Sequence, residues 1–296
     1  MRVHDRLRGP APTIDPAPPA RQRIDRPNIG RRVVRAGSGL WNGVRDLLLP
    51  PGCLFCGADT MGPAPFCRAC RATLRGRPVP RCRLCAMPLP PIGAGNCPAC
   101  AVRRQPWRLD SATCVGSYEG RLREAVLRIK RRGHLPLARG LGVLLAESLR
   151  WGRVEADFVV PVPLHWTKRW RSAADRCAIL AESLAGRLAL PVAPVLRMTR
   201  RVGKQGTLSL EERFRNVRGA FAADATYDIR GRSALLVDDV LTTGATACAA
   251  ARALRRAGVR QVHLATVARA VDHAGPFSDR GPIPSPHPSL RSSTDA

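Results

Sequence analysis

Apolar residues along this chain follow two patterns, short continuous runs and longer stretches with helical spacing. The short runs are bounded by polar or turn-forming residues, which is typical of buried strands, and they cover residues 157–161, 234–237 and 263–268. Apolar residues recur at helical spacing over residues 122–129, 137–149, 178–188 and 245–257. Because strands and helices alternate, the pattern predicts βαβ units and an α/β fold with a central, mostly parallel sheet flanked by helices. Such a sheet places ligands at the carboxyl ends of its strands.

The same pattern divides the 296 residues into four parts. Residues 110–270 carry the α/β rhythm, and residues 41–105 are dominated by cysteine and proline. Residues 1–40 and 271–296 are rich in proline and lack periodic apolar positions. Because neither end can bury enough apolar surface to offset the conformational entropy of ordering it, we predict two disordered tails.

Eight of the eleven cysteines form four Cys-x-x-Cys pairs, Cys53/Cys56, Cys67/Cys70, Cys82/Cys85 and Cys97/Cys100. Each such turn points two thiolates at one tetrahedral ion, and two turns complete the four-thiolate shell of a zinc ribbon. Disulfides and a redox site are the alternatives. A cytoplasmic location disfavours disulfides, and a thioredoxin-like site needs one pair on a βαβ scaffold rather than four in a proline-rich segment.

The cysteine spacing therefore predicts a small N-terminal zinc-ribbon module that holds two Zn²⁺ ions. Because protein thiolates fill all four positions of each shell, no position is left for a substrate and the zinc is structural. Sequential pairing of the turns is the simplest arrangement, and interleaved pairing stays open. The remaining Cys114, Cys177 and Cys248 are interpreted as buried packing residues.

The segment 234–247 reads ALLVDDVLTTGATA and carries the candidate ligand site. An apolar strand ends in Asp238 and Asp239, and a turn of small and hydroxyl residues then leads into an alanine-rich helix. Small residues and a helix N-terminus let backbone amides approach a phosphate, while carboxylates accept hydrogen bonds from sugar hydroxyls. A plain strand-to-helix turn with a threonine cap would explain one Asp and one Thr, but not two acids followed by TTGAT. The segment therefore predicts a sugar-phosphate site.

This segment resembles the signature of type I phosphoribosyltransferases, which bind 5-phosphoribosyl-1-pyrophosphate (PRPP). The resemblance implies a type I phosphoribosyltransferase fold in which Asp238 and Asp239 hold the ribose hydroxyls and act in catalysis. It also implies Mg²⁺ bound together with PRPP. The residues implied to wrap the 5-phosphate are Thr242, Thr243, Gly244, Ala245 and Thr246.

Further segments make residues 50–270 similar to the ComF/GntX (competence protein F) family. In order, these are the cysteine pairs, a Tyr-containing strand at Tyr118, a helix ending at Lys130, the turn Pro161-Val162-Pro163-Leu164, and a mobile loop at 204–209. The resemblance implies that the turn is the pyrophosphate loop. One departure is the stretch RSAADR at 171–176, which lacks the aromatic and amide residues that family members often carry there.

Four basic residues near these loops are candidate ligand contacts. Lys168 and Arg169, together with Arg171, could neutralise the pyrophosphate, with a solvated basic turn as the alternative. The resemblance implies that Lys204 closes over the substrate as part of a catalytic lid, with an ordinary surface loop as the alternative.

Two functions follow from these features. The first is an enzyme that transfers ribose 5-phosphate to an unknown acceptor and releases pyrophosphate. The second is a non-catalytic, PRPP-responsive protein of DNA uptake that binds single-stranded DNA or a helicase-like partner.

The net charge of the chain is +27, from 49 basic and 22 acidic residues, and suits a polyanion. An arginine-favouring genome explains this charge equally well, since only three of the basic residues are lysines. Without a long apolar run or a secretory signal, we expect a cytoplasmic protein that does not insert into membranes.

Overall fold

The computed structural model describes residues 24, 52–60, 64–89, 97–101, 107–131, 133–150, 154–163, 175–200, 202 and 209–271. The two predicted tails lie outside these residues, apart from residues 24 and 271. Within the described ranges, no helix combines the length and the apolar character that crossing a bilayer requires.

The core of the protein is a parallel sheet of four strands in the order β1-β6-β5-β2. The strands are β1 (Ser111–Ser117), β2 (Phe158–Pro161), β5 (Ser233–Leu241) and β6 (Gln261–Arg269). Three of them confirm the apolar runs, and β1 ends just before Tyr118, where the family resemblance implied a strand. Strand β5 also continues past the predicted end at its two acids, because Val240 and Leu241 still pair with β6.

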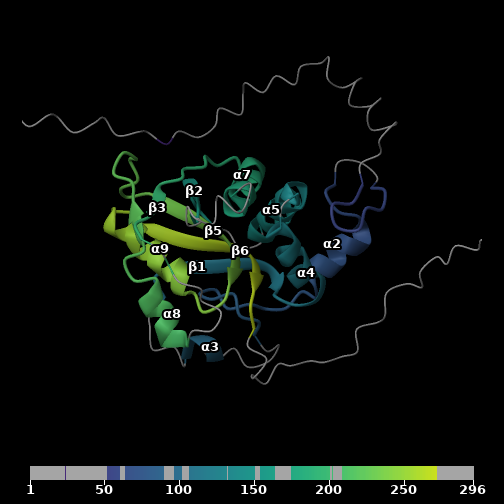
Figure 1. The fold of residues 1–296 in the computed structure, drawn as a ribbon, viewed down its shortest axis with the longest axis horizontal. Helices are drawn as coiled ribbons and strands as arrows, with labels where there is room; N and C mark the ends of the chain where they lie inside the picture. Colours follow the sequence, from purple (N-terminus) through teal and green to yellow (C-terminus); the bar gives the residue numbers. More distant parts are fainter. Residues whose placement is uncertain are drawn as a thin grey trace, which may run out of the picture.

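Helices cover both faces of this sheet (Figure 1). One face packs against α4 (Gly120–Ile129), α5 (Leu135–Arg150) and α7 (Arg176–Leu188), and the other packs against α9 (Ala245–Arg256). Strands β2 and β5 are neighbours, yet the helices that follow them, α7 and α9, lie on opposite faces. This is a topological switch point, where open parallel sheets leave a crevice for ligands at the carboxyl ends of the strands.

A second, two-stranded sheet lies beside the main one. Its strands β3 (Leu196–Met198) and β4 (Phe221–Ala223) pair antiparallel, and neither was predicted. Between them α8 (Leu210–Asn216) begins with a capping box in which Ser209 and Glu212 bond each other's backbone amides. The predicted mobile loop at 204–209 lies outside the described residues except for this Ser209.

The two cysteine modules lie along strand β1, which is an edge of the sheet. The first contains α2 (Arg68–Arg75), and its apolar residues join the core on the α4 and α5 side. The second contains α3 (Pro98–Ala101), and the carbonyl of its Arg83 accepts the amide of Ala112 on β1 at 2.7 Å. The second module thereby covers part of a strand edge that would otherwise present open backbone groups.

Corresponding turns of the two modules differ at one residue. Gly57 follows Cys56 with a φ of 78° and is exposed, whereas Ala86 follows Cys85 with a φ of 55° and is fully buried. A left-handed conformation costs an L-residue about 1 kcal/mol or more. The methyl group of Ala86 offsets this cost, because it packs in the core beside β1.

We expect opposite effects from alanine at two helical glycines. A Cβ at Gly142 of α5 would lie 2.7 Å from the Leu180 carbonyl oxygen of α7, whereas a Cβ at Gly186 would meet nothing within 4 Å. Gly142→Ala should therefore lower the free energy of unfolding by about 1–3 kcal/mol through overpacking. Gly186→Ala should raise it by about 0.5–1 kcal/mol, since alanine is the better helix former. Urea unfolding monitored by circular dichroism measures both, and a neutral Gly142→Ala would contradict the close α5–α7 packing.

Candidate functional site

The two acids of β5 lie at the switch point, each with a partner from a surrounding helix. The Arg176 Nε donates to Asp239 Oδ2 at 2.7 Å, and the Lys130 Nζ lies 3.8 Å from the same oxygen. The Asp239 amide donates to Asp238 Oδ1 at 2.8 Å, and the Cys177 thiol donates to that oxygen at 3.6 Å. Both carboxylates thus sit in fixed orientations at the end of the crevice.

These partners give the two carboxyl groups different protonation behaviour. Burial, together with the charge of Asp239, raises the pKa of Asp238 to about 7. Burial also acts on Asp239, but the Arg176 guanidinium and then the Lys130 ammonium outweigh it and hold the pKa of Asp239 below its ordinary value. Near neutral pH, the pair therefore combines a carboxylate of fixed charge with a carboxyl that exchanges its proton.

The start of α7 brings Arg176 to this pair. Asp175 caps the helix, with its Oδ1 accepting the amides of Cys177 at 3.0 Å and Ala178 at 3.3 Å. Arg176 is then the first helical residue, and Cys177 is buried beside Asp238. The described part of the stretch that departs from the family pattern, Asp175-Arg176, therefore supplies a helix cap and a cation to the site.

The turn after β5 makes the second half of the site. Gly244 has a φ of 76° and begins α9, and a Cβ there would lie 2.3 Å from the Trp107 ring. Both the backbone conformation and the tryptophan therefore require glycine. The Thr243 Oγ1 accepts the Ala245 amide at 3.4 Å, which orders the first turn of the helix.

A small hollow of about 20 Å³ lies between this turn and the sheet, room for one water molecule or one ligand oxygen. Its lining includes Asp238, Thr242, Gly244, Thr246 and Thr266. Thr266 pairs with Asp238 across β5 and β6, is fully buried, and its hydroxyl has no hydrogen-bond partner among the described residues. A buried hydroxyl of this kind is a group that a water or a ligand would satisfy.

The structure brings together seven of the residues that the sequence singled out for the PRPP site, namely Asp238, Asp239, Thr242, Thr243, Gly244, Ala245 and Thr246. Lys168, Arg169 and Lys204 lie outside the described residues. Sequence reasoning missed the contacts of Arg176 and Lys130 with Asp239 and the place of Thr266. Lys130 had a signal, since it ends a helix that the family shares, whereas nothing local marks Thr266.

The cysteines form two separate clusters with the dimensions of tetrahedral zinc sites. One contains Cys53, Cys56, Cys67 and Cys70, and the other contains Cys82, Cys85, Cys97 and Cys100. Tetrahedral Zn–S bonds of about 2.3 Å place the sulfur atoms about 3.8 Å apart. The Sγ separations are 3.8 Å for Cys56–Cys67, 3.8 Å for Cys82–Cys100 and 3.6 Å for Cys85–Cys97. The pairing is therefore sequential, and each cluster fits one structural zinc ion.

Comparison with known proteins finds one match for the cysteine modules and one for the α/β domain. Residues 173–280 match the phosphoribosyl transferase domain, and residues 44–101 match the double zinc ribbon domain. Competence protein F of Haemophilus influenzae is 27% identical over 178 residues, which cover 58% of this chain and 77% of that protein. DNA utilization protein YhgH of Escherichia coli is 29% identical over 171 residues, or 56% of this chain and 74% of that protein.

Among solved structures, a glutamine PRPP amidotransferase from B. subtilis, complexed with ADP and GMP, is 28% identical with a TM-score of 0.31. The match covers 43% of this chain and only 25% of that one. The fold and the two domain matches define a type I phosphoribosyltransferase domain joined to a double zinc ribbon. The similarity to competence protein F and YhgH supports the resemblance to the ComF family.

Sequential zinc pairing has a direct stoichiometric consequence. We expect two zinc ions per chain by elemental analysis. The double variant Cys56→Ser/Cys67→Ser should retain one ion, since both residues belong to the first cluster. The matched variant Cys56→Ser/Cys82→Ser should retain none. The reverse result, with Cys56→Ser/Cys82→Ser keeping one ion, would mean that the turns pair in an interleaved manner.

The raised pKa of Asp238 makes stability depend on pH. In the unfolded chain this carboxyl titrates near about 3.9, so the unfavourable charge is absent below about pH 4 and fully present above about pH 7. Asp238→Asn should therefore be more stable than the unchanged protein at pH 8, by about 1–3 kcal/mol, and nearly equal to it at pH 4. Urea unfolding at both pH values measures the difference. Asp239→Asn is the control and should destabilise at pH 8, because it leaves Arg176 without its carboxylate.

Proposed function

We propose that the protein binds PRPP at the carboxyl ends of β2 and β5 and transfers ribose 5-phosphate to an acceptor, releasing pyrophosphate. The observation that carries this proposal is the pairing, at a topological switch point, of the half-buried Asp238 and the buried Asp239 with a glycine-hinged turn at a helix N-terminus. The acids suit the ribose hydroxyls, and the turn suits the 5-phosphate. A cytoplasmic location fits such a ligand and the reduced thiols of the ribbons.

In the reaction, an acceptor atom forms a bond to C1 of the ribose while the C1–O bond to pyrophosphate breaks. Positive charge develops on the ring, and the carboxylates of Asp238 and Asp239 would stabilise it. Lys130 and Arg176 hold Asp239 ionised, which keeps this stabilisation in place near neutral pH. Mg²⁺, when bound with PRPP, would neutralise the pyrophosphate oxygens.

The remaining roles of the site residues follow the family resemblance. Thr242, Thr243, Gly244, Ala245 and Thr246 would surround the 5-phosphate, with the Thr266 hydroxyl beneath them. Pro161 ends β2 and the Val162 amide donates to the Val237 carbonyl at 2.9 Å, so the turn that would carry Lys168 and Arg169 starts beside the acids. Lys204 would close over the bound substrate and exclude water. The domain limits we propose are 41–105 for the ribbons and 110–270 for the transferase domain.

Thermal unfolding with PRPP tests the binding site. At 100 times the dissociation constant, PRPP with Mg²⁺ should stabilise the folded protein by about 2.7 kcal/mol and raise its melting temperature by several degrees. Asp238→Ala/Asp239→Ala should abolish this protection, whereas Glu124→Ala, an exposed acid on α4, should keep it. Protection that survives in the double variant would place PRPP elsewhere.

Pyrophosphate release from PRPP, assayed across a panel of nucleobases and amines, separates catalysis from binding alone. Release with one acceptor identifies a transferase. PRPP protection without any release would favour the second function, a PRPP-responsive protein that acts in DNA uptake.

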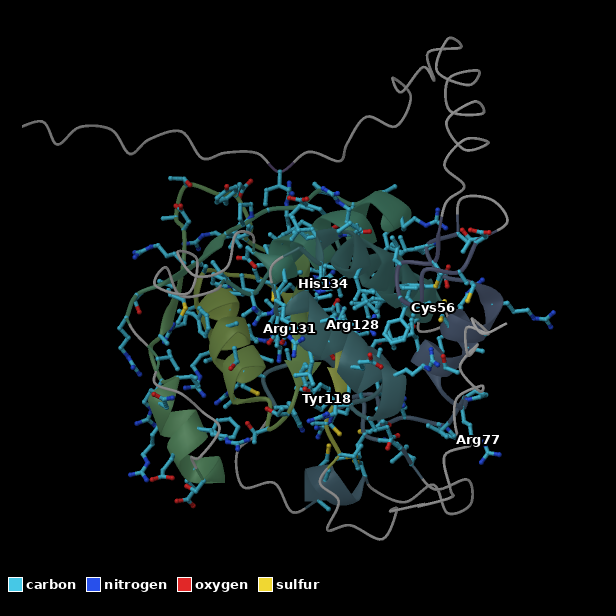
Figure 2. The ribbon with its side chains drawn as sticks, turned by 45° about the vertical axis from the view of Figure 1, so that its right-hand side comes forward. Cys56, Arg77, Tyr118, Arg128, Arg131 and His134 are labelled. Atoms are coloured by element: carbon cyan, nitrogen blue, oxygen red, sulfur yellow. The ribbon has the colours of Figure 1, made fainter. Side chains whose placement is uncertain are left out.

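The second function has one supporting observation, the basic face of α4. Arg121, Arg123, Lys130 and Arg131 are exposed on or just beyond this helix, and Figure 2 shows Arg128 and Arg131 on the same side of the molecule as Tyr118. Phe55 of the first ribbon is buried beneath the guanidiniums of Arg121 and Arg128, at 5.5 and 4.6 Å from its centroid. Since this ring is not open to bases, single-stranded DNA would bind through its phosphates and without sequence preference.

Fluorescence anisotropy with labelled oligothymidine tests this face. Arg123→Ser/Arg131→Ser should weaken binding and lower the slope of log K against log salt by about 1–2. The control Arg187→Ser/Arg197→Ser removes the same charge from other exposed positions and should leave the slope unchanged. An equal loss in both variants would mean that net charge alone attracts DNA. A helicase-like protein tested in place of DNA would reveal whether it uses the same face.

A further inference from the structure

Arg269 is the last residue of β6. Its side chain is buried between the β5–α9 turn, residues 242–244, and the second zinc ribbon. Its Nη1 donates to the carbonyls of Leu241 at 3.0 Å and Thr242 at 2.8 Å, and also to that of Ala270. Its Nε donates to the carbonyl of Cys85 at 2.8 Å. One guanidinium, only 6% exposed, thus binds the end of β5, the first residue of the turn and a zinc ligand.

The bonds to Leu241 and Thr242 fix the direction of the amides that follow them. In a trans peptide, the carbonyl of one residue and the N–H of the next point in opposite directions. No cis peptide is present among the described residues. Since Arg269 holds the Thr242 carbonyl, the Thr243 N–H must point away from Arg269, and the same holds for the Thr242 N–H. Arg269 therefore orients two backbone donors of the turn.

The bond to Cys85 makes this orientation depend on the second ribbon. Cys85 is one of the four cysteines of that cluster, and its Sγ lies 3.6 Å from that of Cys97. The turn is closed behind it by the Ala86 amide, which donates to the Cys82 carbonyl at 2.8 Å. A zinc ion bound to the four thiolates fixes this turn, and with it the carbonyl that receives the Arg269 Nε. Loss of the ion releases one side of the guanidinium.

We propose that Arg269 is a positioning residue that couples zinc occupancy of the second ribbon to the phosphate affinity of the β5–α9 turn. The proposal rests on the proposed binding of PRPP at that turn. Because coupling between two sites is reciprocal in binding free energy, bound PRPP strengthens zinc binding by the second ribbon, and zinc loss weakens PRPP binding. We expect the stronger zinc binding to appear as slower zinc release. The first ribbon has no such bond to the turn among the described residues, so its ion is not coupled.

Hydrogen exchange without ligand tests the positioning role. In Arg269→Met, the amides of residues 242–246 should exchange about ten-fold faster than in the unchanged protein, since a loss of about 1.4 kcal/mol of local stability gives that factor. Arg269→Lys should be intermediate, because a single ammonium cannot reproduce the guanidinium fork. Unchanged exchange in both variants overturns the proposal.

Arg81→Met is the matched control for this experiment. Arg81 also ties the second ribbon to the domain, through the Ala86 carbonyl at 3.1 Å and the Ser117 hydroxyl at 3.3 Å, but among the described residues it forms no hydrogen bond with the turn. In Arg81→Met, the amides of residues 242–246 should exchange at the same rate as in the unchanged protein. Equal acceleration in Arg81→Met would mean that any loosening of the ribbon reaches the turn, which would remove the special role of Arg269.

Zinc release to a chromophoric chelator tests the coupling. PRPP with Mg²⁺ should slow release of one of the two ions by about ten-fold, a typical coupling strength. The variant Cys56→Ser, which lacks the first ion, should keep this effect, whereas Arg269→Lys should lose most of it. A purely structural Arg269 would alter both release rates without making either depend on PRPP.

The outcomes separate this proposal from the proposed function. If calorimetry shows PRPP binding while neither ion's release depends on PRPP, the coupling is wrong and the function stands. If PRPP does not bind, the proposed function is wrong, and the exchange experiment still decides whether Arg269 orders the turn.

Discussion

Two adjacent carboxylates near the end of a buried strand repel each other, and the architecture around the site reflects this constraint. The chain brings Arg176 from the start of α7 and Lys130 from the end of α4 to the same oxygen of Asp239. Asp238 receives no such cation and instead accepts an amide and a thiol. One acid is therefore held ionised and the other near its titration point, so the site does not bury two full charges near neutral pH.

The zinc ribbons solve a different problem, because segments this short cannot bury a core of their own. Each ribbon obtains its rigidity from a four-thiolate cluster and its apolar contacts from the neighbouring domain. The first ribbon places Phe55 and Leu74 against α4 and α5, and the second joins the edge of β1. The second ribbon in turn covers the edge strand β1 of the sheet.

Much of the fold and half of the site were accessible from the sequence because their signals are local. Cysteine spacing predicted both zinc clusters, and the apolar runs with the DD-TTGAT segment predicted β5, α9 and the seven residues of the turn and acids. The contacts that complete the site are not local. Arg176 reaches Asp239 across 63 positions and Arg269 reaches Cys85 across 184, and no spacing rule marks such pairs. Strand β1 was indicated only by the resemblance at Tyr118, because Ser111–Ser117 mixes small and polar residues and shows no apolar run of its own.

Ala86 shows where the limits of an independently folding unit lie. At the equivalent turn of the first ribbon, Gly57 adopts the left-handed conformation without strain and faces solvent. In the second ribbon, a methyl group occupies this conformation and fills space in the interior of the transferase domain. A fragment that starts after the cysteines would therefore expose a void and an unpaired strand edge. The sequence reads as two modules, but the second ribbon supplies part of the core and covers one edge of the sheet.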